Sequence, residues 1–471
     1  MLSPLQEKMF HEIKLKSIFR LAEQYAFNYA DTVRECPVYP KSDAIADLDN
    51  FVEELPDATG NAVDVLEQLN RYGTPASVAQ TGGRYFGFVT GGVIPASLAA
   101  RWLSDFWDQN TALYVMSPIA AKLEEVCESW LKTLFGLPQR VVAGFVSGSS
   151  AAILCGLAAA RYRILHNNGW NINTQGFYGA PRIRIIAGRQ AHAAVIKAIA
   201  LLGFGTDTIE WVKTDAQGKM ILSEIPKLDE RTILILQAGN VGSGAFDAFD
   251  TICEKADRSK AWVHIDGAFG LWAAASKRLI HLTKGIEKAD SFSVDGHKTL
   301  NMPYDSGMVL CNDQKALTHA LHASGSYITY SEERDGMLYT PEMSRRARVV
   351  ELWAALKYLG KKGVDDLVYG LHQRALQMAR ELEAENFRIL NEVVFNQVLA
   401  ACDSDAITDL TMRYIQESGE CWVGGAHWNQ KVVIRISICS WATTEDDITR
   451  SVTAFVAARN KAVQEIKPSC C

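Results

Sequence analysis

Several features that would assign this chain to a specialised class of protein are missing. Lys and Arg together number 48 against 54 Asp and Glu, which gives a formal net charge of -6 at pH 7, and no dense basic tract is present. A chain with this charge has no broad attraction to nucleic acid or anionic lipid, so neither is an expected partner. The sequence also lacks a run of eighteen apolar residues, so no membrane-spanning helix is predicted.

Metal-binding and disulfide patterns are absent as well. The ten cysteines are scattered, with no C-x-x-C pair and no His/Cys cluster. Neither a metal site nor a disulfide framework is therefore expected, and a reducing compartment is favoured. The first residues, Met-Leu-Ser-Pro-Leu-Gln-Glu-Lys, carry charge where a signal peptide needs an apolar core, so the cytoplasm is the expected location.

What is present indicates a large α/β protein in three parts. Apolar content of 48% and charged content of 22% are ordinary for a globular chain. We expect an N-terminal helical segment over 1–80, a large domain over 81–340 and a small domain over 341–471. The first part has apolar residues near helical spacing, which either its own chain or a partner subunit could cover: Phe10, Ile13, Leu15, Ile18, Leu21 and Tyr25.

The large domain alternates apolar strands with helices. Strands are predicted at 141–146, 182–187, 232–237, 262–265, 291–294 and 307–311, and helices at 96–107, 117–135, 149–164, 192–202 and 249–256. This alternation predicts a mainly parallel sheet with helices on both faces. The small domain should hold helices at 344–359 and 365–384, strands at 387–390 and 432–439, and a last helix after the capping signal at 443–447.

Two of these strands end in residues that suit one cofactor. The strand at 262–265 runs into Asp266, and the strand at 291–294 leads to Asp295-Gly-His297-Lys298. Ligands bind at the carboxyl ends of strands in open α/β sheets, so Asp266 and Lys298 are expected to face one crevice. A lysine amine forms a Schiff base with the aldehyde of pyridoxal 5′-phosphate, and a carboxylate keeps its pyridine nitrogen protonated. The apolar residues after Lys298 are expected to lower its pKa; a surface or ion-paired lysine is the alternative.

Two helix starts could complete this site. Ser147-Gly148-Ser149-Ser150 precedes the helix at 149–164, whose free N–H groups could bind a phosphate, although an ordinary N-cap is the alternative. His192 begins the next helix and could stack on the pyridine ring, or serve only as a cap or surface residue.

Aromatic residues and a long polar loop are candidates for the substrate pocket. Tyr85, Phe86 and Phe88 lie in the Gly-rich segment 81–92 and either line a pocket or fill the core. With Trp107 they favour an aromatic or bulky substrate, whereas Arg84 is available for an acidic one. The loop 319–340 is predicted to close over the site, and it carries Tyr327, Tyr330 and Tyr339.

In this order, the motifs resemble those of the group II pyridoxal-phosphate-dependent amino acid decarboxylases, which include the aromatic-L-amino-acid and glutamate decarboxylases. The resemblance covers roughly residues 80–455. It is carried by Ser147-Gly-Ser-Ser150, Gln190-Ala-His192, His264-Ile-Asp266-Gly-Ala268 and Asp295-Gly-His297-Lys298, with support from Ser117-Pro118, Gly244-Ala-Phe-Asp247, Arg345-Arg-Ala-Arg348 and Arg435 to Thr443.

The resemblance implies the aspartate-aminotransferase fold (fold type I), with a mainly parallel seven-stranded sheet in the large domain and a small C-terminal α+β domain. It implies a homodimer with active sites at the interface and interlocking N-terminal helices. It also implies that Lys298 binds the cofactor covalently, Asp266 pairs with the pyridinium and His192 stacks on the ring. The remaining implied contacts are Gly148, Ser149, Ser150, Ala268 and His297 for the cofactor, and Phe86, Phe88, Tyr330 and Tyr339 for the substrate pocket.

The implied activity is decarboxylation of an L-amino acid to the amine and CO2. Other pyridoxal phosphate chemistry (a carbon–carbon lyase, aldolase or aminotransferase) and a silent binding subunit are the alternatives. Arg435 could bind an α-carboxylate and favour transamination, or it could pair with a neighbouring acid. Asp295 stands where many relatives have Asn or Ser near the phosphate, and a carboxylate there would repel this group unless it turns away or is hydrogen-bonded.

Overall fold

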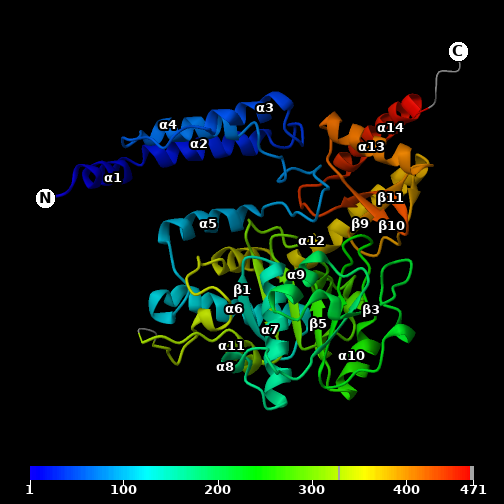
Figure 1. Ribbon diagram of the computed structural model, residues 1–471. Helices are drawn as coiled ribbons and strands as arrows, with labels where there is room; N and C mark the ends of the chain where they lie inside the picture. Colours follow the sequence, from blue (N-terminus) through cyan, green and yellow to red (C-terminus); the bar gives the residue numbers. More distant parts are fainter. Residues whose placement is uncertain (327–328, 467–471) are drawn as a thin grey trace.

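A sheet of seven strands lies at the centre of the large domain, covered by helices on both faces (Figure 1). The computed structural model describes residues 1–326 and 329–466. The strand order is β1-β7-β6-β5-β4-β2-β3, and all pairs are parallel except those that β7 makes with β1 and β6. The strands are β1 Val142–Val146, β2 Arg184–Gly188, β3 Ile209–Val212, β4 Thr232–Gln237, β5 Trp262–Asp266, β6 Ser291–Asp295 and β7 Gly307–Cys311.

The predicted mainly parallel sheet is therefore confirmed, including the six strands expected from apolar runs. The strand that the sequence did not predict is β3, which lies at the edge of the sheet. It is only four residues long and its two central residues, Glu210 and Trp211, are not buried. Such a short, half-polar stretch lacks the continuous apolar run by which buried strands are recognised.

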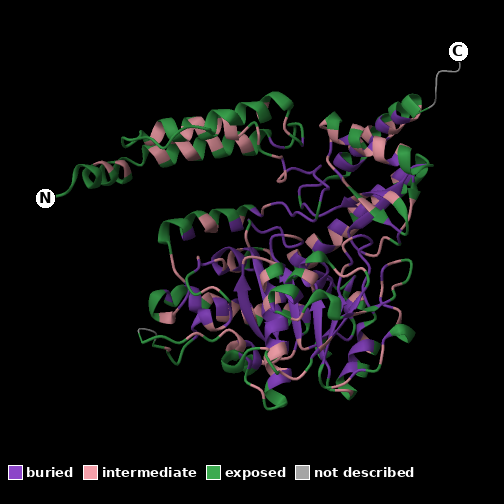
Figure 2. Ribbon diagram, viewed as in Figure 1, coloured by how far each residue is buried: buried purple, intermediate pink, exposed green. Residues whose placement is uncertain are grey.

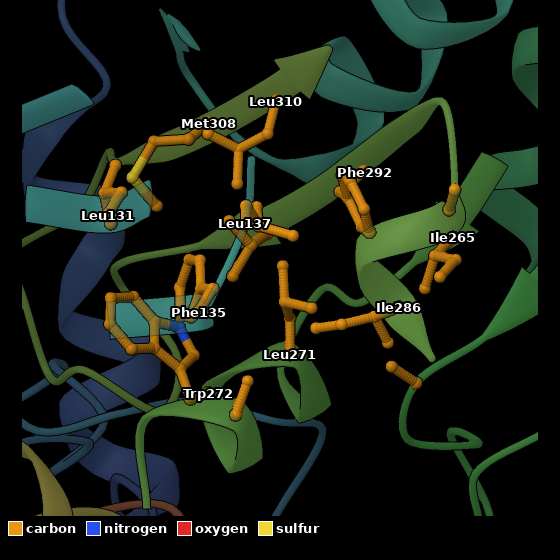
Figure 3. Packing of buried hydrophobic residues seen from close by; sticks show 14 of the residues in the cluster. Leu131, Phe135, Leu137, Ile265, Leu271, Trp272, Ile286, Phe292, Met308 and Leu310 are labelled. Carbon is orange, nitrogen blue, oxygen red and sulfur yellow. The ribbon is translucent and has the colours of Figure 1, made fainter. Parts of the chain in front are cut away.

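Alternate residues of each strand point to opposite faces, so the sheet separates two apolar clusters. On one face Phe292 and Leu310 pack with Phe135 and Trp272 (Figure 3), in a layer that includes α6 Pro118–Phe135, α10 Phe249–Arg258 and the start of α12. On the other face Ile185, Ile235 and Val309 pack against α7 Ser149–Asn167, α9 Ala193–Leu201 and α11 Gln314–Ala320. The short helix α8 Ile172–Gln175 follows α7.

The C-terminal unit is built on a second, antiparallel sheet of order β10-β11-β9-β8. Its strands are β8 Arg388–Ile389, β9 Gln397–Ala401, β10 Gly424–Trp428 and β11 Lys431–Ser437, and its helices include α13 Asp405–Ser418 and α14 Glu445–Ile466. The expected capping signal is confirmed, since Asp447 accepts the Thr444 N–H at 2.9 Å and donates its own N–H to the Thr444 hydroxyl at 3.1 Å. Strands β9 and β10 were not predicted.

The helix α12 Val349–Ala384 runs from the large domain into the C-terminal unit. Its first half, including Val349 and Leu352, packs in the core of the large domain, and its second half, including Met378 and Leu382, packs in the C-terminal core. Gly360 breaks the helix with φ 58° and ψ -176°, where the sequence placed the gap between two helices. The expected division at residue 341 thus lies just before an element shared by both parts.

The N-terminal segment extends over the rest of the molecule as an arm (Figure 1). It contains α1 Pro4–Leu15, α2 Ser17–Thr32, α3 Ser42–Ala46 and α4 Ala62–Gln68, none of which has a buried residue, and it is followed by α5 Pro95–Trp107 (Figure 2). The arm contacts α5 through the ring pairs Phe19–Phe106 and Phe27–Trp102. No helix within residues 1–326 and 329–466 is long and apolar enough to cross a membrane.

Candidate active site

A cavity of about 360 Å³ lies where the strands β4 and β5 and the loop after β6 meet the segment 88–90 and β11. This volume falls in the usual range for small-molecule sites. Asp266, Lys298 and His192 all line it, so the structure brings together three residues that lie far apart in the sequence. The complete lining is Phe88, Val89, Thr90, His192, Gln237, Gly239, Val241, Asp266, Ala268, Phe269, Lys298, Tyr304 and Arg435.

Asp266 is the last residue of β5 and is 6% exposed. Its Oδ1 accepts the Ala268 N–H at 3.2 Å and the Ser293 hydroxyl at 3.3 Å. These contacts hold the carboxyl group in a fixed orientation at the cavity wall. Ala268, which the resemblance placed at the cofactor, also lines the cavity.

Lys298 lies in a tightly packed turn after β6. The residues that follow it, Thr299 to Met302, are all buried, as their sequence indicated. Gly91 packs directly on this turn, because a Cβ at that position would lie 2.2 Å from the Lys298 carbonyl oxygen. The Lys298 Nζ lies 3.0 Å from Asp295 Oδ2, so the amine that faces the cavity is also ion-paired.

The predicted phosphate loop lies beside this ion pair. Helix α7 has Gly148 as its N-cap, a residue with no side chain to accept a capping hydrogen bond. The Ser149 N–H donates to Asp295 Oδ1 at 2.5 Å, while the Ser150 side chain is exposed. Gly148, Ser149 and Ser150 do not line the cavity. Asp295 connects this loop to Lys298, because its carboxylate contacts both.

His297 is also set back from the cavity wall. Its Nδ1 accepts the Ser306 N–H at 3.0 Å, its Nε2 lies 3.7 Å from Asp295 Oδ2, and its ring stacks on Tyr304 with 4.2 Å between centroids. Burial lowers the pKa of His297, partly offset by the Asp295 carboxylate. His297 therefore contacts both Asp295 and a residue of the cavity wall.

His192 combines a capping role with a place in the cavity. It is the N-cap of α9, and its Nδ1 accepts the Ala194 N–H at 3.2 Å. A nitrogen that accepts this bond carries no proton, so the neutral ring holds its proton on Nε2. Burial lowers the pKa of His192, with the Asp266 carboxylate acting in the opposite direction. His192 therefore caps α9 and also lines the cavity, and its stacking on the pyridine ring stays a prediction.

Three polar residues of the wall were not singled out from the sequence. Gln237 ends β4, next to Asp266 on the neighbouring strand, and Tyr304 and Thr90 approach from two loops. A polar residue at the carboxyl end of an apolar strand was the available signal for Gln237. No local pattern distinguishes Tyr304 or Thr90, because their positions depend on how the loops pack.

Arg435, on β11, brings a positive charge to the cavity. Its Nη1 donates to the Val241 carbonyl at 3.3 Å, and it makes no ion pair within the part of the chain that the structure describes. The paired alternative considered for Arg435 is therefore wrong. Burial lowers the pKa of this guanidinium. A desolvated cation without a carboxylate partner favours an anionic ligand.

Phe88 is the aromatic residue of the segment 81–92 that reaches the cavity. It is 63% exposed, and its ring stacks at 5.8 Å on Trp422, which stacks on Tyr85 at 5.3 Å. The prediction for Phe86 is wrong: this ring is fully buried in the C-terminal core, because the strand-like segment 84–86 pairs with Trp422 and Ser437. Residues two apart in an extended segment point to the same side, but Phe88 has a positive φ of 51°, so the backbone turns after Phe86 and the two rings point to different places.

The loop tyrosines do not line this cavity. Tyr339 is 8% exposed in the core beside α7, and its hydroxyl accepts a hydrogen bond from Gln314 at 3.0 Å. Tyr330 donates to the Ala323 carbonyl within its own loop at 2.6 Å. Each side chain is held by local contacts within one chain, and the expected place of these tyrosines in the substrate pocket stays a prediction. Tyr327 lies outside the described residues.

Comparisons with known proteins agree with this arrangement. The family model "Pyridoxal-dependent decarboxylase conserved domain" matches residues 52–400, more than half of the chain. The chain belongs to the pyridoxal-dependent decarboxylase family. It is 26% identical to an aromatic-L-amino-acid decarboxylase of Bacillus atrophaeus over 89% of this chain and 90% of that protein. It is 28% identical to the acidic amino acid decarboxylase GADL1 of Mus musculus over 72% of this chain and 64% of that protein.

A solved structure of Oryza sativa TDC with PLP and tryptamine has the same fold, with a TM-score of 0.88 at 19% identity. It covers 98% of this chain and 99% of that one. As a family member the protein is a pyridoxal-phosphate-dependent amino acid decarboxylase, and its cofactor is pyridoxal 5′-phosphate. The expected fold type and cofactor are thereby confirmed.

The residues present fit this cofactor. An amine and a hydrogen-bonded carboxylate line one cavity, and the N-terminus of a long helix lies beside the amine. These are the groups that an aldehyde, a ring nitrogen and a phosphate require in a decarboxylase of this family. The exception is Asp295, a second carboxylate at the helix start.

Proposed function

We propose that Lys298 and Asp266 hold the cofactor of this decarboxylase and that its substrate is an L-amino acid bound between Phe88, His192 and Arg435. The observation that carries the proposal is the placement of Lys298, Asp266 and Arg435 around one cavity. Asp266 ends β5, Lys298 lies in the turn after the neighbouring parallel strand β6, and Arg435 comes from the C-terminal unit. The site therefore depends on the large domain and the C-terminal unit together.

Each residue has a separate task. Lys298 binds the cofactor aldehyde through its amine, Asp266 holds a proton at the ring nitrogen, and His192 covers one face of the ring. The cofactor supplies the electron sink that makes loss of CO2 feasible. The N-terminus of α7, with Ser149 and Ser150, lies on the side of Lys298 where we place the phosphate. The protein contributes orientation and removal of water.

Proton transfer to the substrate carbon requires a donor in the same cavity. Burial raises the pKa of Tyr304 to about 12, so its phenol keeps its proton at neutral pH. The His192 Nε2–H is the second candidate donor, since Nδ1 is occupied as an acceptor. We also propose that the loop 319–340 closes over the cavity and excludes water, in the assembled enzyme.

For the substrate side chain, an aromatic or bulky group is supported by Phe88. Its exposed ring, already stacked on Trp422, gives a flat apolar surface at the mouth of the cavity. Aromatic pairs gain roughly 0.5–1.5 kcal/mol beyond burial of area. The aromatic-L-amino-acid decarboxylase of Bacillus atrophaeus is a relative with this specificity in its name.

An acidic side chain is the second candidate, and Arg435 favours it. If the guanidinium binds a side-chain carboxylate, the α-carboxylate remains free to leave. Arg84, the other basic residue considered for this role, pairs with Glu420 at 3.3 Å and Asp447 at 3.4 Å in the C-terminal unit. It is 3% exposed, so the earlier suggestion for Arg84 is wrong.

A homodimer is proposed on the exposed apolar residues of the arm and of α5. Phe10, Ile13, Trp102, Leu103 and Phe106 are each 40% exposed or more. A patch of this kind on a single chain is typical of a subunit interface. We also propose the cytoplasm as its location, because the cysteines of the described residues form no disulfide and all except Cys36 are buried.

Borohydride reduction followed by peptide mapping tests the central assignment. The expected product of the purified holoenzyme is a pyridoxyl group on Lys298, absent from Lys298→Ala. Release of CO2 and formation of keto acid should then be measured over L-tryptophan, L-tyrosine, L-phenylalanine, L-glutamate, L-aspartate and L-cysteine sulfinate. A pyridoxyl group on another lysine would refute the site, and keto acid as the main product would refute decarboxylation.

A further inference from the structure

Asp295 is a buried acidic residue whose backbone N–H and carbonyl are both hydrogen-bonded. It is the last residue of β6 and is 1% exposed. Its N–H donates to the Ala268 carbonyl at 2.9 Å, and its own carbonyl accepts the Trp272 indole N–H at 2.8 Å. The backbone of Asp295 is therefore fixed at the end of the strand, and its side chain is buried.

The two oxygens of this carboxylate bind two different groups of the cofactor site. Oδ1 accepts the Ser149 N–H at 2.5 Å and so caps a 19-residue helix whose own N-cap residue, Gly148, has no side chain. Oδ2 lies 3.0 Å from Lys298 Nζ and 3.7 Å from His297 Nε2. One carboxylate thus contacts both the N-terminus of α7 and the Lys298 amine.

The start of α7 lies close to the groups that surround Asp295. A Cβ on Gly148 would lie 3.3 Å from His297 Cε1 and 3.7 Å from Asp295 Oδ1, so the loop, the imidazole and the carboxylate are closely packed. Gly307 also packs directly against Gly148, since a Cβ added to Gly307 would lie 2.4 Å from the Gly148 Cα. Two like charges at about 4 Å repel strongly when they are removed from water.

We propose that Asp295 is an internal anion that competes with the cofactor phosphate for the N-terminus of α7 and so weakens cofactor binding. The inference rests on the cofactor site proposed above. Asp295 acts here as a positioning residue, through Ser149 and Lys298. To bind the phosphate, the protein must release the Ser149 N–H from Asp295 or accommodate both anions, and either requirement reduces affinity.

The test is a titration of the full-length apoprotein, prepared by stripping cofactor from the holoenzyme, followed by tryptophan fluorescence. Asp295→Asn removes the charge and keeps an oxygen that can accept the Ser149 N–H. We expect this variant to bind pyridoxal 5′-phosphate and inorganic phosphate about tenfold more tightly than the wild type. Pyridoxal, which lacks the phosphate, should gain much less.

The three ligands separate the routes by which Asp295 could act. A gain with pyridoxal 5′-phosphate and inorganic phosphate supports competition at α7. An equal gain with pyridoxal would overturn the proposal, because Asp295 would then act through Lys298 alone. Unchanged or weaker binding of inorganic phosphate by Asp295→Asn would overturn it as well.

Two further variants keep the experiment decisive. Asp295→Ser removes the charge with a smaller side chain, in case the amide disturbs folding, and a thermal melt reports on both proteins. Asp250→Asn is the matched control, since it removes a carboxylate from a surface pair with Lys284 and Lys288 and should leave all three affinities unchanged. If the wild type itself fails to bind pyridoxal 5′-phosphate, the proposed site fails; if only the gain is missing, only this inference fails.

Discussion

Among single residues, Arg435 gives the sharpest test of substrate class. Its guanidinium is desolvated and has one long hydrogen bond, to the Val241 carbonyl, so a substrate carboxylate would be its principal partner. Arg435→Met should raise the KM for an acidic substrate by about tenfold or more, which corresponds to the loss of one charge-assisted hydrogen bond. Activity on an aromatic substrate should change little.

Arg435→Lys is the control for this experiment, because it keeps the positive charge and should retain part of the affinity. Steady-state kinetics on L-glutamate and L-tryptophan provide the measurement. An equal loss on both substrates would contradict a side-chain role and indicate that Arg435 binds the α-carboxylate that all amino acids share.

His264, on the strand that carries Asp266, links pH to stability. Its ring is fully buried, Nδ1 lies 2.8 Å from the Ser291 hydroxyl, and Nε2 has no partner among the residues that the structure describes. Burial lowers the pKa of His264 to about 3. The unfolded chain takes up a proton below its ordinary pKa of about 6.5 while the folded chain does not, so stability is complete above this pH and falls as pH decreases.

The expected decrease in the free energy of unfolding is about 1.4 kcal/mol per pH unit from this residue between roughly pH 6 and pH 4. His264→Phe keeps a planar ring and should reduce the slope of the unfolding free energy against pH by the amount that one bound proton contributes. Urea denaturation at several pH values measures this slope. An unchanged slope in the variant would show that His264 is protonated in the folded state.

Among the secondary-structure elements, α12 owes its shape to one glycine. Gly360 has φ 58° and ψ -176°, a conformation that L side chains rarely adopt, and a Cβ there would meet no atom within 4 Å. Gly360→Ala should therefore destabilise the protein by roughly 1–3 kcal/mol through backbone strain alone. Chemical denaturation is the measurement.

Gly370, in the same helix, is the matched control. It has helical backbone angles and a Cβ there would also meet no atom within 4 Å. Gly370→Ala should stabilise the protein by up to about 1 kcal/mol, since alanine favours helix. If both variants shifted stability in the same direction, the break at Gly360 would not require glycine.

The elements also show what the sequence could predict. Strands β4, β5 and β6 and the turn to Lys298 were identifiable because continuous apolar runs end in polar residues and glycine. Strands β9 and β10 were not predicted. For β10 the reason is that Gly424–Trp428 is half exposed and begins with two glycines, so its pairing with β11 determines its structure. Tyr304 lines the cavity although it was not singled out, and Phe86 is buried although it was expected in the pocket. In both cases the packing of distant segments, and not the local sequence pattern, determines which ring reaches the cavity.

In the whole molecule, the arm formed by α1 to α4 has apolar residues that a single chain leaves exposed to solvent. Phe10 and Ile13 lie one helical turn apart in α1 and are 60% and 62% exposed. If a second copy covers them, Phe10→Asp with Ile13→Asp should weaken the dimer by at least about a hundredfold, because two apolar contacts are replaced by charges.

Sedimentation equilibrium over a range of protein concentrations measures this effect. His11→Asp is the matched control, since it introduces the same side chain at an exposed polar position of the same helix and should leave the dimer intact. A monomeric wild type, or a variant that dimerises as the wild type does, would contradict the proposed role of the arm.

The burial of Phe86 has a consequence for how the protein is made. Every other member of its apolar cluster comes from residues 375–458, so the ring has nothing to pack against until the ribosome has translated nearly all of the message. Until that moment the nascent polypeptide must carry this aromatic group uncovered, together with the edge of backbone from Arg84 to Phe86 that later pairs with Trp422 and Ser437. Premature termination anywhere before β9 would leave both exposed, and such fragments should be substrates for chaperones and proteases.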